Sequence, residues 1–111
     1  MPTSIDSNPF SLGRVAPAVG SPAALTANIP DFDCSHVNMI LVQADPDNAG
    51  RCYFGTALLD PAAKTGVVYA LAVGGDSFVL GSSAQNVYRL SEFRIAVDNP
   101  GDGAYVSVYV R

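Results

Sequence analysis

The residue types that most often do chemistry are scarce in this sequence. His36 is the only histidine, so a catalytic centre built on an imidazole would have to use it, and Cys34 precedes it by two positions. In an extended segment residues i and i+2 share a face, which would let these two side chains touch. An imidazole-activated thiolate also needs an orienting group and a pocket. The pattern indicates neither, so we expect no catalytic residues and a protein that is not an enzyme.

The cysteines and acidic residues do not form a recognisable metal motif. Cys34 and Cys52 are separated by neither a CxxC redox spacing nor the spacing of a zinc clip. Two buried free thiols are the favoured interpretation because a reducing cytosol disfavours a bridge, and a disulfide is the alternative. Residues 45–50 superficially resemble a calcium loop, but Ala49 and Thr56 stand where ligands are needed. We expect neither a metal nor a cofactor.

Composition limits the classes of partner. Charged residues make up 14% of the chain and hydrophobic residues 49%, which is apolar for a small domain and favours a surface covered by neighbouring subunits. The net charge is −4 and the basic residues are scattered, so the cationic stripe that nucleic acid requires is missing. No apolar run reaches the roughly 18 residues of a spanning helix. The first fifteen residues lack the features of a secretory signal. We therefore expect synthesis in the cytosol, with neither nucleic acid nor membrane as a partner.

Residues 1–33 differ in composition from the rest of the chain. They contain five of the eight prolines and few charges, and neither a helix nor a continuous ladder tolerates that proline density. A disordered tail is one interpretation. The other, which the isolated apolar residues favour, is an extended N-terminal arm that adds a strand to the open edge of another subunit. The expected partner-binding residues are Phe10, Leu12, Val15 and Leu25 in this arm, together with the turn residues Asp47 and Asn48.

Residues 34–111 show short β-type runs separated by turn residues. The runs over 36–43 and 51–59 are expected to form a hairpin closed by the turn at 45–50. The run over 67–73 would be apolar on both faces of a strand, which is typical of a strand that is covered on both sides. In the last run, Val106, Val108 and Val110 face one way and Tyr105, Ser107 and Tyr109 the other. Strands are predicted over 36–43, 51–59, 67–73, 77–80, 86–97 and 104–110.

These runs predict an all-β chain. No window has a sustained apolar period of 3.6 residues, and residues 90–93 could supply only one helical turn. Short strands with Gly and Pro turns predict a single antiparallel β-sandwich, with a jelly roll favoured over a closed barrel. The expected organisation is an N-terminal arm over residues 1–33 and a β-sandwich domain over residues 34–111.

Several segments carry a resemblance to a known class of proteins. They are residues 42–50, residues 53–55, residues 75–78, a strand that contains Leu90, and the ending over 101–110. With these motifs the chain resembles small β-sandwich accessory virion proteins of tailed bacteriophages. In such proteins a first strand ends near a DP-N-G turn, and a terminal Gly-Asp strand closes the sheet. The similarity covers residues 36–110 and leaves out the arm.

The resemblance implies a role in assembly. It predicts a structural protein of the capsid surface, a cement or decoration protein that binds and stabilises the phage head shell through its arm and subunit contacts. The implied partners are the major capsid protein or other virion subunits, with a homo-oligomer, dimer or trimer, of the chain itself. A neck, tail or host-recognition module is the alternative, followed by a carbohydrate-binding β-sandwich whose aromatic side chains stack on sugars.

Overall fold

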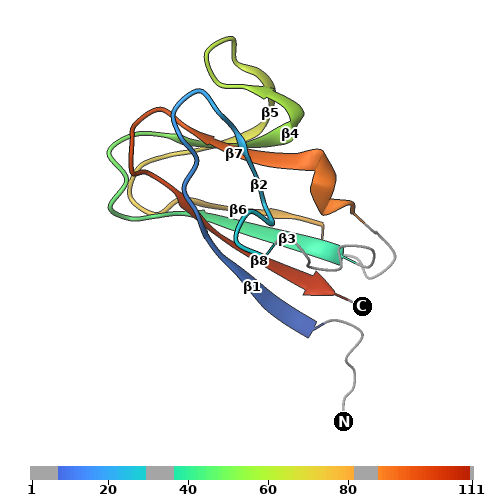
Figure 1. Ribbon diagram of the computed structural model, residues 1–111. Coiled ribbons are helices and arrows are strands. Elements are labelled where there is room, and N and C mark those ends of the chain that lie inside the picture. Colours follow the sequence, from blue (N-terminus) through green and yellow to red (C-terminus); the bar gives the residue numbers. More distant parts are fainter. Residues whose placement is uncertain (1–7, 30–36, 82–87, 111) are drawn as a thin grey trace.

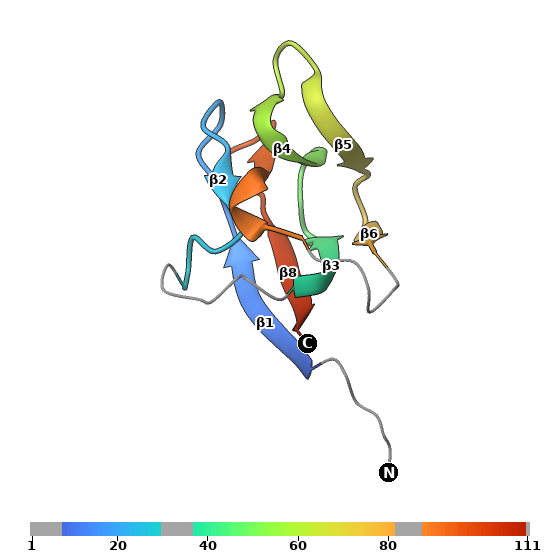
Figure 2. The same cartoon turned by 90° about the vertical axis from the view of Figure 1, so that its right-hand side faces the viewer.

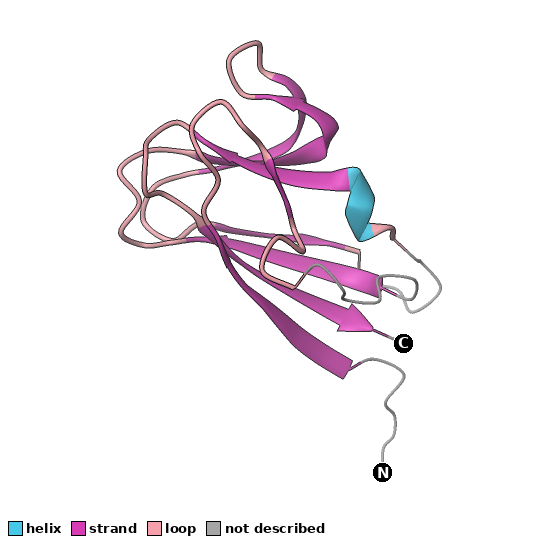
Figure 3. Ribbon diagram, in the orientation of Figure 1, coloured by secondary structure: helices cyan, strands magenta, loops and turns pink. Residues whose placement is uncertain are grey.

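A computed structural model describes residues 8–29, 37–81 and 88–110, and nearly all of its regular structure is β. One turn of 3-10 helix, η1 (Leu90–Glu92), is the only helical element in these ranges (Figure 3). The all-β prediction is therefore confirmed. The strands are β1 (Asn8–Val15), β2 (Ala23–Ala24), β3 (Val37–Ala44), β4 (Cys52–Asp60), β5 (Thr65–Leu71), β6 (Ser77–Leu80), β7 (Phe93–Val97) and β8 (Ala104–Val110).

The strands form two antiparallel sheets that pack face to face as a β-sandwich (Figure 1). The first sheet, called sheet A, has the order β1-β8-β3-β6, and the second, sheet B, has the order β2-β7-β4-β5. Figure 2 shows β1 and β2 on one side of the sandwich and β5 and β6 on the other. The described residues include no helix long and apolar enough to span a membrane.

The predicted hairpin between the runs at 36–43 and 51–59 is wrong. Strand β3 lies in sheet A between β8 and β6, whereas β4 lies in sheet B between β7 and β5. Residues 45–51 connect them by crossing from one sheet to the other. The segment does contain a turn, but a connection of this length can span the about 10 Å between stacked sheets instead of closing a hairpin.

The core lies between the two sheets. Alternate side chains of β3 and β8 point into it, among them Ile40, Val42, Val106 and Val108, all fully buried. The predicted alternation over 104–110 is confirmed. At the centre the ring of Phe54 stacks on Phe93, with centroids 5.3 Å apart, and lies 6.0 Å from the ring of Phe78.

The N-terminal segment belongs to this sandwich. Strand β1 pairs with β8 from Asn8 opposite Val110 to Val15 opposite Ala104, and β2 pairs with β7. The prediction of an arm over residues 1–33, with a domain boundary after it, is therefore wrong for residues 8–29; residues 1–7 and 30–33 lie outside the described ranges. Proline density was a poor guide because β1 is an edge strand, where Pro9 can lack an N–H group at little cost.

The apolar run over 67–73 predicts a strand that is covered on both faces. This prediction is wrong, because β5 is an edge strand and one of its faces is partly exposed. The side chain of Val68 is 40% exposed. Two left-handed residues flank the start of β5, Lys64 in the turn before it at φ 60° and Gly66 within it at φ 71°. A Cβ atom on Gly66 would lie 2.7 Å from the backbone of Leu58, so this close approach requires glycine. Leu59, near the end of β4, packs with Tyr53 and Ala96 on the outer face of sheet B.

Candidate functional site: the outer faces of the two sheets

Three of the expected partner-binding residues lie in the protein's own core. Leu12 and Val15 are each 1% exposed, and Leu25 is fully buried. Their assignment to partner binding is wrong because they pack between the sheets, where a partner cannot reach them. Phe10, in contrast, is 48% exposed on the edge strand β1.

The two turn residues have different roles. Asn48 is 6% exposed, and its side-chain amide donates to the carbonyl of Gly103 at 2.8 Å while its oxygen accepts from the N–H of Gly103 at 2.9 Å. It therefore joins two turns and is not available to a partner. Asp47 is exposed, but its turn is attached at Gly103, before the start of β8, whereas Phe10 pairs with Val108 toward the other end of that strand. The structure does not bring Phe10 and Asp47 together.

A second residue holds the same two turns. The carboxylate of Asp102 is 5% exposed and accepts from the backbone N–H groups of Ala49 and Gly50, each at 2.9 Å. The side chains of Asn48 and Asp102 thus satisfy backbone groups at the end of the sandwich. The resemblance of this segment to a calcium loop has a structural explanation, and the described residues contain no group of three or more candidate metal ligands.

An ion pair at this end joins β1 to the turn. The guanidinium of Arg14 donates to the carboxylate of Asp45 at 2.8 Å and to the carbonyl of Gly101 at 2.7 Å. The backbone N–H of Asp47 also donates to Asp45, at 2.9 Å. The hydrogen bond from Asp47 and then that from Arg14 lower the pKa of the Asp45 carboxyl below its ordinary value of 3.8.

We predict a stability change with pH that depends on Asp45. Because its pKa is lower in the folded chain, the carboxylate stabilises the fold above its ordinary pKa, and this stabilisation is lost as pH falls through the folded value. Asp45→Asn should unfold at a lower urea concentration at pH 7 and lose less further stability on acidification. The exposed Asp47→Asn is the matched control and should follow the parent protein. An identical pH dependence of Asp45→Asn and the parent in urea titrations would contradict the prediction.

The outer face of sheet A carries no charged side chain on its central strands β8 and β3 or on β6. Leu41 lies at its centre, opposite Ser107 on β8 and opposite Val79 on β6. Val79 is 49% exposed and Tyr105 45% exposed. The face, called the sheet A outer face below, consists of Ser11, Met39, Leu41, Gln43, Ser77, Val79, Tyr105, Ser107 and Tyr109.

The guanidinium of Arg14, beside this face, is already neutralised. Arg14 pairs with Tyr105 in the β1–β8 register, and its guanidinium is held by Asp45. The alternation of Tyr105, Ser107 and Tyr109 with buried valines was visible in the sequence. The partners of these side chains on β3 and β6 were not, because the register between strands far apart in sequence decides which residues meet.

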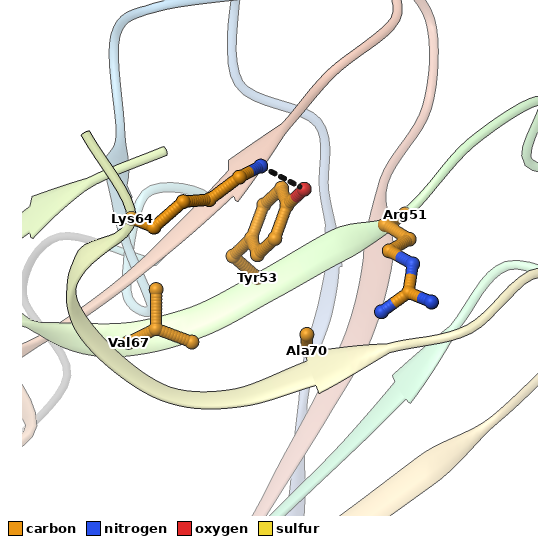
Figure 4. A pocket seen from close by; sticks show the side chains of 5 residues that line it. All are labelled: Arg51, Tyr53, Lys64, Val67 and Ala70. Carbon is orange, nitrogen blue, oxygen red and sulfur yellow. Dashed lines mark hydrogen bonds between the residues drawn. The ribbon is translucent and has the colours of Figure 1, made fainter. Parts of the chain in front are cut away.

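The outer face of sheet B is different and contains a pocket of about 440 Å³ (Figure 4). Tyr53 on β4 and Val67 and Ala70 on β5 form its floor, and the cations Arg51 and Lys64 stand at its two ends. The β4–β5 hairpin brings all five residues together. No sequence motif marks them, since strand pairing alone places Lys64 over Tyr53.

The polar groups beside the pocket form a chain of hydrogen bonds. The ammonium group of Lys64 donates to the hydroxyl of Tyr53 at 2.8 Å, and that hydroxyl donates to the carboxylate of Asp98 at 2.8 Å. The Lys64 nitrogen also lies 4.7 Å from the centroid of the Tyr53 ring. The hydrogen bond to Tyr53 raises the pKa of Lys64, while nearby Arg51 opposes the rise.

Cys52 is the one cysteine among the described residues. Cys52 is a buried free thiol, and burial raises its pKa to about 12, so it is protonated and unreactive at neutral pH. Cys34 and His36, the other members of the candidate pairs, lie outside the described residues.

Comparisons of the chain with family models, with curated proteins and with solved structures find no match.

Proposed function

We propose that this protein is a non-catalytic structural component of a phage virion, a capsid cement or decoration protein that binds the head shell and stabilises it. The observation that carries the proposal is the uncharged, partly aromatic sheet A outer face. The proposed partner of this face is the major capsid protein, with the other virion subunits as further candidates.

The composition of this face is that of an interface core. The buried centres of protein interfaces are enriched in Tyr and Met and depleted in Lys, Asp and Glu. Met39, Leu41, Tyr105 and Tyr109 lie here on neighbouring strands, whereas solvent-facing strands normally alternate hydrophobic with polar side chains. A partner that covered this face would remove apolar surface from water without leaving a buried charge unpaired.

The fold also suits a protein that acts through its faces. We infer that the sandwich is a jelly roll, because its strands form the nested antiparallel pairs β1–β8, β2–β7, β3–β6 and β4–β5. An eight-stranded double sheet of this kind recurs in viral capsid domains. Since residues 8–29 belong to the sandwich, the proposal assigns binding to a sheet face and no longer to an arm of 33 residues.

Leu41→Lys tests the proposal at the centre of the face. A lysine here would place an unpaired charge in the buried contact, so we expect binding to capsids that lack the protein to weaken by about tenfold or more. The measurement is co-sedimentation with such capsids, followed by their thermal rupture. Leu58→Lys is the matched control, because Leu58 is 81% exposed on the other sheet and should tolerate the same change.

The outcomes separate the alternatives. Equal binding by Leu41→Lys and Leu58→Lys would exclude the sheet A outer face as the contact. No binding of the parent protein at micromolar concentration would contradict the cement role and favour a neck, tail or host-recognition module. The same variants in sedimentation equilibrium test the proposed homo-oligomer, since loss of a dimer or trimer in Leu41→Lys alone would show that the face joins copies of this chain.

A further inference from the structure

The pocket on sheet B has one cation that the fold does not use. The ammonium group of Lys64 is linked to the carboxylate of Asp98 through the Tyr53 hydroxyl, by two hydrogen bonds of 2.8 Å each. Arg51 is exposed, and its guanidinium makes no hydrogen bond or ion pair within the described part of the chain. Figure 4 shows it at the opposite end of the floor from Lys64. The pocket therefore presents one free guanidinium beside an otherwise balanced set of charges.

This charge balance selects the kind of anion. A guanidinium binds a carboxylate with two parallel hydrogen bonds, which gives both strength and orientation. A phosphate carries a second negative charge that would need a second free cation, and Lys64 already serves Tyr53. The net charge of −4 further disfavours polyanions. A singly charged carboxylate fits the site.

The rest of the pocket selects the body that carries the carboxylate. Val67 and Ala70 supply an apolar floor, whereas Tyr53 and Lys64 supply a hydroxyl and an ammonium group at the far end. A sugar ring has an apolar C–H face and hydroxyl groups around its rim, so it complements both. The volume of about 440 Å³ lies within the usual range of about 300–1,000 Å³ for small-molecule sites.

We propose that this pocket binds an acidic sugar, a hexuronic acid unit whose carboxylate pairs with Arg51 and whose hydroxyls face Tyr53 and Lys64. The inference is independent of the cement role, because the pocket lies on the outer face of sheet B and the proposed capsid contact lies on sheet A. A particle that carries this protein would then present acidic-sugar sites away from its shell contact.

The test is a titration of the full chain with glucuronate, followed by amide chemical shifts. We expect saturable shifts at Val67, Ala70 and Tyr53. Glucose, the neutral sugar, should bind with an affinity at least about tenfold lower, because it lacks the carboxylate. Arg51→Gln should weaken glucuronate binding about tenfold. Arg89→Gln is the matched control, since Arg89 is also an exposed arginine and does not line the pocket.

Each comparison can overturn the proposal. Equal shifts with glucose and glucuronate would exclude carboxylate recognition. Equal affinity for acetate and glucuronate would exclude the sugar ring as part of the ligand. Shifts that are absent, or that persist unchanged in Arg51→Gln, would exclude the pocket as the site. None of these results depends on capsid binding, so failure of this proposal leaves the test of the sheet A outer face intact.

Discussion

A chain that begins at residue 34 should fail to fold. The deletion removes β1 and β2, so β8 loses a paired neighbour in sheet A and β7 loses one in sheet B. It also removes Leu12, Val15 and Leu25 from the core, three of its fully buried side chains. Small domains have only about 5–15 kcal/mol of net stability, which a loss of this size exceeds. Circular dichroism and the dispersion of amide NMR signals measure the outcome.

Two single substitutions in the full chain test whether the truncated chain fails because it loses core side chains or only because it is shorter. Leu25→Ala should lower the free energy of unfolding by about 2–5 kcal/mol, because it leaves a cavity between the sheets. Val19→Ala removes an apolar side chain that is 50% exposed and should change it by about 0.5 kcal/mol or less. Cooperative unfolding of the truncated chain, with dispersed signals, would restore the interpretation of residues 1–33 as a dispensable arm.

The largest effect of a single substitution is expected at Phe54. Its ring is fully buried, stacks on Phe93 at 5.3 Å and also lies near Phe78. Phe54→Ala would remove the largest fully buried side chain among the described residues and leave a cavity that the two sheets cannot close. We expect a loss of about 3–5 kcal/mol in the free energy of unfolding, measured by urea denaturation.

Leu58→Ala is the control for this prediction, since it removes an exposed side chain of the same strand. Its unfolding midpoint should match that of the parent protein. A loss below about 1 kcal/mol in Phe54→Ala would mean that the aromatic cluster does not hold the sheets together, contrary to the burial and stacking described above.

Local pattern was informative wherever a strand follows a regular alternation. The strand over 104–110 has the predicted bounds and faces, because a period of two residues is the direct consequence of the pleat. The strand predicted over 86–97 is wrong at residues 90–92, which form the 3-10 turn η1, and β7 begins only at Phe93. In β1 the same signal is broken by a register shift between Ser11 and Gly13, which leaves Leu12 and Val15 both buried at a spacing of three. No period-two pattern could reveal this strand.

The candidate sites were less accessible to sequence reasoning. The sequence predicted only one part of the uncharged face, the tyrosines of β8. Its centre, Leu41, becomes central only because β3 lies between β8 and β6. Arg51 and Lys64 carry no motif and meet only across the β4–β5 hairpin. The turn residue Asn48 fits a contact residue by its type and position, but its hydrogen bonds to Gly103 make it structural.

By itself the sequence determined that the chain is all-β, where six of its strands lie and which side chains of the last strand face inward, because these properties follow from neighbours along the chain. Only the tertiary structure decided that residues 8–29 complete the sandwich, that β3 and β4 belong to opposite sheets, and that Arg51 and Lys64 share a pocket. The physical reason is that strand pairing joins residues distant in sequence, and the free energy that selects each pair comes from burial between the sheets and not from local preference.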